Sequence, residues 1–354
     1  MSTLLAADAL PVPVAHSRSP NQRAWERFRR NRLGYRSLWV FLALLLLTTL
    51  GELVSNDRPF VARVDGQTFF PIVDNPSDKA LGGDFLTPAD WKDPFIAETL
   101  ARPGNWKVGT LNPHSATSTN YFSKVPAPAA PDAANFLGTD RFGRDMLARL
   151  LYGFRVSIWF AIALTVIGTL IGIVMGAVQG YFGGRIDLGL QRVIEVWGAV
   201  PELYLLIIIA SIFEPSLLLL LVLLSLWGWI GLSDYVRAEF LRNRSLEFVK
   251  AARALGLSSG QIIRRHVLPN SLTPVITFLP FRMSGAILAL TSLDFLGLGV
   301  PSSVPSLGEL LKQGKDSLDA WWIIVPTFVL LTVTMLLLTF IGDALRDAFD
   351  TRKS

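Results

Sequence analysis

The chain has no cysteine and only three histidines in 354 residues, His16, His114 and His266. The absence of cysteine excludes disulfide bonds, thiolate metal sites and cysteine nucleophiles. The three histidines lie far apart in the sequence, which disfavours a metal centre or a histidine-based catalytic site. We therefore predict no metal site, no catalytic site and no cofactor in this chain.

Charged residues are also few, at 17% of the chain, whereas 51% of the residues are hydrophobic. An ordinary soluble domain needs less apolar content, so the composition indicates a membrane protein. The formal net charge is +5. The basic residues lie beside apolar segments and do not form one patch with interleaved aromatic residues, so they indicate membrane topology and not nucleic-acid binding.

The N-terminal region divides into a tail and an anchor. Residues 1–22 are rich in Pro, Ala and Ser and are predicted to be disordered or loosely held. Residues 1–15 carry no basic region typical of a signal peptide, whereas several arginines directly precede the apolar run Leu38–Val54. We predict that residues 1–37 are a cytoplasmic tail and that residues 38–54 form the first, retained membrane span.

The remaining hydropathy pattern predicts an all-α membrane protein with six transmembrane helices. Residues 55–152 contain no apolar run long enough to span and are predicted to form a large periplasmic segment between spans 1 and 2. The five later apolar segments are Val156–Gly180, Ala199–Phe213, Leu217–Leu232, Val275–Gly299 and Trp322–Ile341. They define a transmembrane domain over residues 153–343, followed by a cytoplasmic tail at 344–354.

The basic residues between spans agree with an N-terminus inside the cell. The segment 233–274 is predicted to be cytoplasmic and carries seven basic residues, whereas the two short outward loops carry Lys312 and Lys315 alone. An alternative is that the short segment 199–213 is re-entrant, which would invert the topology of every later segment. We favour the topology that keeps the basic loop in the cytoplasm.

Residues 245–270 interrupt the apolar half of the chain with a predicted helical hairpin. Ser245 is predicted to cap a first helix, 246–255, and Gly256 to end it in a left-handed conformation. Ser258 and Gln261 have the spacing of a capping box for a second helix, which Pro269 is predicted to end. The hairpin is too polar to be a further span.

The residue spacing predicts a docking face on this hairpin. Phe248, Ala251, Ala252 and Leu255 share one predicted face of the first helix, and the second helix is lined by Ile262, Ile263, His266 and Val267. The small alanines would let a partner approach closely. A solvated basic loop that only sets topology is one alternative, and a DNA-binding helix–turn–helix is another, although the adjacent spans leave little room for a duplex.

The hairpin resembles the EAA motif of ABC-importer permeases, in which a cytoplasmic hairpin docks onto the ATP-binding subunit. The matching residues are Ala251, Ala252, Gly256, Leu268 and Pro269, whereas Lys250 stands where the motif name has glutamate and His266 replaces an aliphatic residue. The segments 135–158, 180–201 and 292–311 are similar to the C-type permeases of the oligopeptide/dipeptide (OppC/DppC) branch. From about Arg23 onward the chain looks most like the YejE type, which imports peptides and peptide-like antibiotics such as microcin.

This resemblance implies a type I ABC importer permease in the bacterial inner membrane, with both termini in the cytoplasm. It implies the following partners: a second homologous permease (YejB/OppB-like), ABC ATPase subunits that bind ATP and Mg²⁺, a periplasmic peptide-binding protein and membrane lipid. Nucleic acid is not an expected partner. The residues expected to couple to the ATPase are Lys250, Ala251, Ala252, Arg253, Gly256, His266, Leu268 and Pro269.

Three further features have structural and functional interpretations. Asp294, inside the fifth apolar segment, is a candidate for the substrate path, although a gating or structural role is favoured. The Gly-, Asp- and Arg-rich stretch 135–145 either fixes the turn before the second span or contacts a delivered substrate or its binding protein. Gly168, Gly172 and Gly176 recur every four residues and predict close helix packing.

Two other functional classes are less consistent with the residues. An intramembrane enzyme would need a paired catalytic set, but the spans offer Asp294 and scattered serines. A channel or secondary transporter would need no ATPase partner, and no internal repeat indicates one. The run Gly308–Asp316 lacks the spacing of a phosphate-binding loop, so any ATP hydrolysis is expected in another subunit.

Overall fold

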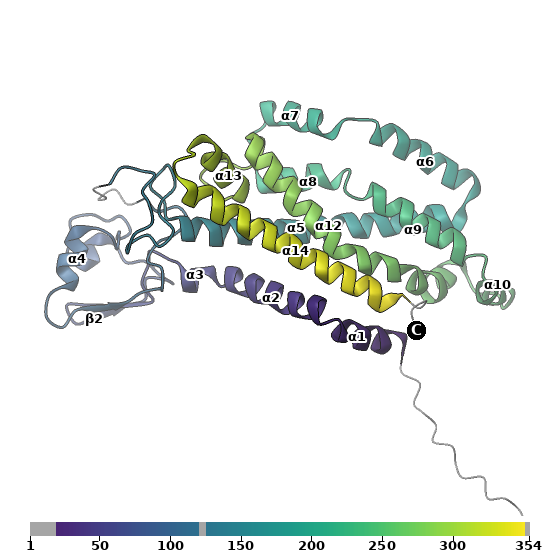
Figure 1. Cartoon of the computed structure of the whole chain (residues 1–354), viewed down its shortest axis with the longest axis horizontal. Helices are drawn as coiled ribbons and strands as arrows, with labels where there is room; N and C mark the ends of the chain where they lie inside the picture. The colour runs from purple at the N-terminus through teal and green to yellow at the C-terminus, as the bar shows by residue number, and fades with distance from the viewer. Residues whose placement is uncertain (1–18, 120–124, 351–354) are drawn as a thin grey trace, which may run out of the picture.

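A computed structural model describes residues 19–119 and 125–350. The tail predicted to be disordered, residues 1–22, therefore lies almost entirely outside the described residues. Long helices run side by side along one axis (Figure 1). One end of this bundle holds α1 (Pro20–Arg30), α10 (Glu247–Ala254) and the last turn of α14 (Trp321–Phe349), and we call it the hairpin end. The opposite end holds the strands, α4 (Pro94–Leu100) and α13 (Leu307–Asp316), and we call it the sheet end.

The N-terminal region begins with an amphipathic helix that packs on the C-terminal helix. Helix α1 (Pro20–Arg30) starts at a capping box of Ser19 and Gln22. Its Phe28 is buried against Ala344 and Ala348 of α14 (Trp321–Phe349). Helix α2 (Arg32–Thr49) and the short α3 (Gly51–Val54) follow. The first span thus begins six residues before the predicted Leu38, and part of the predicted tail is helical.

The polar segment after the first span contains a small sheet that the hydropathy pattern did not predict. Strands β1 (Val61–Val64), β2 (Gln67–Phe69) and β3 (Trp106–Val108) pair antiparallel in the order β2-β1-β3. Asp65 and Gly66 both have positive φ, as a two-residue hairpin turn requires. The 3₁₀ helix η1 (Asp78–Leu81) and α4 (Pro94–Leu100) complete the segment. Its core is Ala62, Val64, Leu81, Ala89, Trp91 and Ile96.

The structure has five helices long and apolar enough to cross a membrane, or six if one bent pair forms a single span. The bent pair is α6 (Gly184–Gly198) and α7 (Glu202–Ile212), which meet at 61°. Its break includes Pro201, which cannot donate a backbone hydrogen bond. The predicted span 199–213 was therefore too short, and the predicted loop 181–195 is mostly helical. Arg237 of α9 (Ile230–Asn243) donates one hydrogen bond to each carboxylate oxygen of Asp187 in α6, at 2.5 and 2.7 Å.

The contacts between α5 (Met146–Phe182) and α9 (Ile230–Asn243) show how the bent pair is oriented. Gly168 faces Gly228, Gly176 faces Ser233, and Gly180 faces Phe240. Both residue numbers rise together, so the two helices are parallel. The chain between them must return along the bundle, and this excludes the re-entrant alternative. With α6 and α7 as one span, the six predicted spans are confirmed.

The glycine spacing in α5 also has the predicted structural consequence. A Cβ atom at Gly176 would lie 2.4 Å from the carbonyl oxygen of Ser233 and 2.7 Å from Cβ of Val236. A Cβ atom at Gly172 would lie 3.0 Å from the carbonyl oxygen of Trp229. These glycines therefore allow the close backbone approach of α5 and α9.

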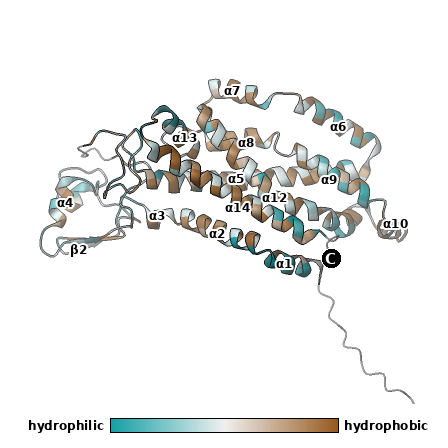
Figure 2. Cartoon of the chain, viewed as in Figure 1, coloured by the Kyte–Doolittle hydropathy of each residue, from teal (hydrophilic) through white to brown (hydrophobic). Residues whose placement is uncertain are grey.

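Three more helices complete the bundle. Helix α8 (Leu217–Ser225) leads into α9, and α13 (Leu307–Asp316) lies between α12 (Leu268–Leu296) and α14. A shared apolar core runs through α5, α8, α12 and α14 and includes Phe154, Ile158, Leu223, Ile287 and Leu331. Figure 2 shows hydrophobic residues along these helices, whereas α1 is largely hydrophilic.

Candidate functional site

The predicted hairpin is present at the hairpin end and turns at Gly256. Helix α10 (Glu247–Ala254) leads to α11 (Ser259–Ile262). Gly256 has φ of +78°, its N–H donates to the carbonyl of Arg253, and the N–H of Leu257 donates to the carbonyl of Ala252. This pair of bonds is a Schellman motif, which requires the left-handed residue that glycine adopts most easily. The predicted helix stop at Gly256 is confirmed.

Of the two predicted N-caps, only one forms. Ser258 accepts a hydrogen bond from the N–H of Gln261, whose side chain accepts one from the N–H of Ser258, so the capping box is confirmed. Ser245 does not cap α10, because its hydroxyl donates to the carbonyl of Arg242 at 2.8 Å. Leu246 takes the N-cap position without a side-chain hydrogen bond, so the predicted Ser245 cap was wrong by one residue.

Replacing Ser258 by alanine is expected to loosen the start of α11. The loss of an N-cap costs about 1 kcal/mol, which corresponds to about fivefold more local opening. Hydrogen exchange at the amides of residues 259–262 measures this effect. The matched control is Ser245→Ala, which removes an exposed hydroxyl that caps no helix. Equal acceleration of exchange near both serines would contradict the assignment of the caps.

Pro269 does not end the second helix, contrary to prediction. A π-helical turn, η2 (Ile263–Val267), joins α11 to α12. Leu268 keeps helical angles, with φ of −57° and ψ of −49°. Pro269 falls in the first turn of α12, where its missing N–H and fixed φ are tolerated. As a result, residues 259–296 form one continuous helical unit from the hairpin into a membrane span.

One side of the hairpin packs on the bundle. Val249, Ala252, Ile262 and Val267 are buried in a cluster with residues of α5, α9 and α12. Phe248, Ala251 and Leu255 are exposed, as a face that docks on a partner requires, whereas Ala252, which was predicted to share that face, is buried against the bundle. The outward surface of α10 therefore combines exposed apolar side chains with the exposed bases Lys250 and Arg253.

The other predicted coupling residues lie on the same hairpin. Lys250 forms an exposed ion pair with Glu247 at 2.8 Å. His266 is half-buried, with its ring centroid 6.4 Å from that of Phe248. Leu268 is half-buried and Pro269 is exposed. All eight residues that are expected to couple to the ATPase therefore lie in or directly after the hairpin.

Arg244 and Asn243 fasten the base of the hairpin to the bundle. The guanidinium of Arg244 donates to the carbonyls of Gly180 and Tyr181 at 3.2 and 3.1 Å. The side-chain amide of Asn243 donates to the hydroxyl of Ser271 at 2.8 Å in a buried site. The hairpin is therefore anchored to α5 and α12 and does not hang on a flexible loop.

Asp294 lies at the sheet end, far from the hairpin residues along α12. Its carboxylate is 5% exposed and accepts hydrogen bonds from the N–H of Val300, at 2.9 Å, and from the hydroxyl of Ser306. Gly299 and Gly308 pack so closely against Asp294 that a Cβ atom at either would clash with it. Both carboxylate oxygens are thus used to fix the turn between α12 and α13, which supports the structural role.

A buried ion cluster next to this turn includes part of the stretch 135–145. Arg149 is fully buried and contacts Glu309 of α13, while its Nη1 donates to the carbonyl of Ala116 at 3.3 Å. Arg144 contacts Asp140 at 2.6 Å and Glu309 at 3.5 Å. The cluster ties the polar segment, α5 and α13 together.

Two of the four charged residues in the stretch 135–145 pair with each other. Asp140 and Arg144 pair, but Arg141 lies over the ring of Phe142 at 4.9 Å. Asp145 caps α5 by accepting from the N–H of Ala148, and its carboxylate also accepts from Asn112. These contacts support the interpretation of a turn that fixes the start of the second span.

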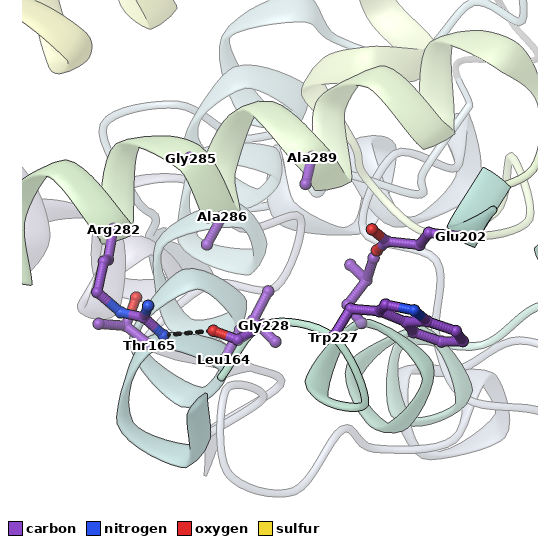
Figure 3. A pocket seen from close by; sticks show the side chains of 10 residues that line it. Leu164, Thr165, Glu202, Trp227, Gly228, Arg282, Gly285, Ala286 and Ala289 are labelled. Carbon is purple, nitrogen blue, oxygen red and sulfur yellow. Dashed lines mark hydrogen bonds between the residues drawn. The ribbon is translucent and has the colours of Figure 1, made fainter. Parts of the chain in front are cut away.

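Two ionisable residues that line a cavity within the predicted spans were missed. Glu202, at the start of α7, and Arg282, in α12, line one cavity together with Trp227 and Thr165 (Figure 3). The sequence contained a signal for both, because a charged residue within an apolar segment is a functional candidate by default. The prediction applied this criterion to Asp294 alone. The sequence could not show that Glu202 and Arg282 line the same cavity.

Comparisons with known proteins match most of the chain. The family model described as "Binding-protein-dependent transport system inner membrane component" matches residues 168–354, and the one described as "N-terminal TM domain of oligopeptide transport permease C" matches residues 19–72. The chain is 46% identical to "Inner membrane ABC transporter permease protein YejE" of Escherichia coli, which covers 94% of this chain and 98% of that protein.

Two further similarities follow. The chain is 43% identical to "Peptidoglycan transport system permease protein YejE" of Agrobacterium fabrum, which covers 94% of this chain and 93% of that protein. Among solved structures, it is similar to the methionine ABC transporter MetNI in an inward-facing conformation. The TM-score is 0.47 at 18% identity, over 57% of this chain and 97% of that one.

Proposed function

Because the chain belongs to the family of binding-protein-dependent transport inner membrane components, we propose that it is a permease subunit of an ATP-driven importer for oligopeptides or peptide-like compounds. The family makes it a membrane transport subunit and not itself an enzyme. The substrate class is supported by the match to the N-terminal domain of oligopeptide permease C and by relatives named for dipeptide, oligopeptide and peptidoglycan transport.

The single observation that carries the proposed mechanism is the continuity of the hairpin with a membrane span. Residues 259–296 form one helical unit, and α10 presents exposed apolar and basic side chains beside it. An ATPase subunit docked on this surface would displace α12 directly. We assign this coupling role to Lys250, Ala251, Ala252, Arg253, Gly256, His266, Leu268 and Pro269.

The distribution of charge supports a topology for this subunit. The arginines of α1 and the bases of the hairpin lie at the same end of the bundle (Figure 1). The positive-inside rule then puts the hairpin end and both termini in the cytoplasm of a bacterial inner membrane. The sheet end, including residues 55–145, faces the periplasm, where a peptide-binding protein would deliver substrate.

The remaining parts of the importer are separate chains. We propose that a second homologous permease completes the substrate path and that ATP and Mg²⁺ bind to ATPase subunits beneath the hairpins. Helices α6 and α7 carry many exposed large apolar side chains, including Leu188, Val196, Tyr204 and Ile212, which lipid or the second permease would cover.

Purification and reconstitution test this function. The tagged chain is isolated from its native membrane in mild detergent, its partners are identified by mass spectrometry, and the complex is placed in proteoliposomes with the binding protein. Recovery of an ATPase and a second permease, with peptide uptake that requires ATP, is the expected result. Uptake without ATP, by the chain alone, would instead indicate a channel or secondary transporter.

A further inference from the structure

A cavity of about 270 Å³ lies inside the membrane-spanning part of the bundle. Its walls come from α5, α7, α12 and the connection between α8 and α9 (Figure 3). The lining combines small apolar residues, such as Gly285, Ala286 and Ala289, with the polar side chains of Thr165, Glu202, Trp227 and Arg282. Such a mixture of apolar wall and a few convergent polar groups is typical of a ligand site.

Three buried polar atoms in this lining have no hydrogen-bond partner. They are Oγ1 of Thr165, Nε1 of Trp227 and Nε of Arg282. The eleven-residue stretch 158–168 of α5, which includes Thr165, is otherwise apolar, and Thr165 itself is 5% exposed. Buried polar groups without partners are costly, so their presence together around one cavity indicates that a polar ligand satisfies them.

The charges of the cavity are separated across it. Figure 3 shows the guanidinium of Arg282 beside Thr165 on one side, and the carboxylate of Glu202 near Trp227 on the other. Arg282 already donates one hydrogen bond, from Nη2 to the carbonyl of Gly228 at 2.7 Å. Within the described residues, the side chain of Glu202 has no hydrogen bond and no ion pair, so its carboxylate is available to a ligand. A site with opposite charges held apart suits a zwitterion.

A second cavity of about 300 Å³ adjoins Arg282 on the side toward the hairpin end. It is lined by Gly231, Leu232, Tyr235, Phe278, Phe281 and Arg282. Arg282 therefore stands between a polar cavity and a mainly apolar one, on the same helical unit that begins in the hairpin. This position allows a movement of α12 to change the contacts of a bound molecule.

We propose that this cavity is a binding site for the charged termini of a short peptide in transit. The guanidinium Nε–H of Arg282 and the hydroxyl of Thr165 donate to the terminal carboxylate. Glu202 accepts from the terminal ammonium group, and the indole N–H of Trp227 donates to a peptide carbonyl. The inference rests on the proposed function, since it names where the transported peptide contacts this subunit.

Calorimetric binding of trialanine to the purified complex, without the binding protein, tests this site directly. Trialanine is expected to bind to the wild-type complex, and amidation of its carboxyl end to weaken binding about tenfold or more, because one charge-assisted contact is lost. Arg282→Gln should weaken trialanine binding by a similar factor and abolish the difference between acid and amide. Arg155→Gln is the matched control, because this arginine of α5 does not line the cavity.

Glu202→Gln provides a second, independent variant, because Glu202 makes no hydrogen bond within the described residues that its loss would break. It should weaken trialanine binding and abolish the difference between trialanine and its N-acetyl form. The site is overturned if the wild-type complex does not bind trialanine. It is also overturned if trialanine, its C-terminal amide and its N-acetyl form bind equally to the wild type and to both variants. If ATP-driven peptide uptake occurs nevertheless, the proposed function stands without it. If no uptake of any peptide occurs, the proposed function fails, and this site fails with it.

Discussion

Replacing Gly256 by glutamate is expected to release the ATPase subunits from the purified complex and to abolish ATP-driven uptake. Gly256 adopts φ of +78° at the apex of the hairpin, where the Schellman bonds close α10. A side chain in this conformation costs about 1–2 kcal/mol, and a new carboxylate changes the charge of a basic docking surface. Every 1.4 kcal/mol lost from docking weakens it about tenfold. Recovery of ATPase with the tagged chain measures the effect.

Two controls separate backbone strain from charge. Gly256→Asn should retain most of the ATPase, because asparagine tolerates the left-handed conformation better than other residues. Gly260→Glu adds the same carboxylate to α11 at a glycine with an ordinary negative φ and open space around it. If Gly256→Glu retains the ATPase as well as the original chain does, the hairpin is not the docking element.

Replacing Arg149 by methionine is expected to destabilise the permease strongly. Arg149 is fully buried between Glu309 and Asp140, with Asp140 4.0 Å from its Nε. Removing one partner from a buried ion cluster costs about 3–5 kcal/mol, because it leaves the opposite charges uncompensated. The midpoint of thermal unfolding in detergent, and the yield of folded protein, measure the loss.

The matched control for this effect is another arginine of α5. Arg155 pairs with Glu52 at 3.4 Å, but both side chains remain accessible, at 28% and 60%. Arg155→Met should therefore cost less than about 1 kcal/mol. Glu309→Gln combined with Arg149→Met should recover part of the lost stability, since it removes one uncompensated charge. Similar destabilisation by Arg149→Met and Arg155→Met would contradict the role of the buried cluster.

The sequence predicted correctly those features that depend on residues close together in the chain. Ser258 with Gln261 and the left-handed Gly256 were located correctly, because capping and helix ends depend on neighbouring residues. The repeated glycines of α5 were interpreted correctly, because their spacing puts them on one helix face. The apolar runs located the spans, although several helices extend ten or more residues beyond the predicted bounds.

The errors come from contacts that the sequence does not display. Ser245 looked like a cap, but α9 continues to Asn243 and its last turn takes the serine hydroxyl. Pro269 looked like a stop, but the π-helical turn before it lets the helix continue. Ala251 and Ala252 are adjacent, and only packing against α5 and α9 shows that Ala252 is the buried one.

The cavity residues could not be grouped from the sequence for the same reason. Glu202 and Arg282 are 80 positions apart, and the bend between α6 and α7 brings the first to the cavity that the second lines. Asp294 drew attention as an ionisable residue in a span, yet its carboxylate holds a turn. A charged residue within an apolar segment is therefore a candidate for a functional role. The hydrogen bonds in the structure then show that Asp294 is a structural residue, whereas the carboxylate of Glu202 is available to a ligand.

One helical unit connects the proposed parts of the mechanism. Residues 259–296 begin in the hairpin, pass Arg282 between the two cavities and end two residues after Asp294. The π-helical turn and Pro274 and Pro280 lie within this unit, where bending concentrates in helices. A displacement of the hairpin by an ATPase would therefore move Arg282 relative to Glu202.

The most direct test of the central claim is site-specific cross-linking of the hairpin to the ATPase. The chain has no cysteine, so Leu255→Cys introduces a single thiol at a side chain that is 80% exposed on the hairpin. Leu318→Cys introduces one of equal accessibility, 79%, at the sheet end. In native membranes, a cysteine-to-lysine cross-linker should join the ATPase to Leu255→Cys and not to Leu318→Cys. Cross-linking of the ATPase through Leu318→Cys alone would contradict the account.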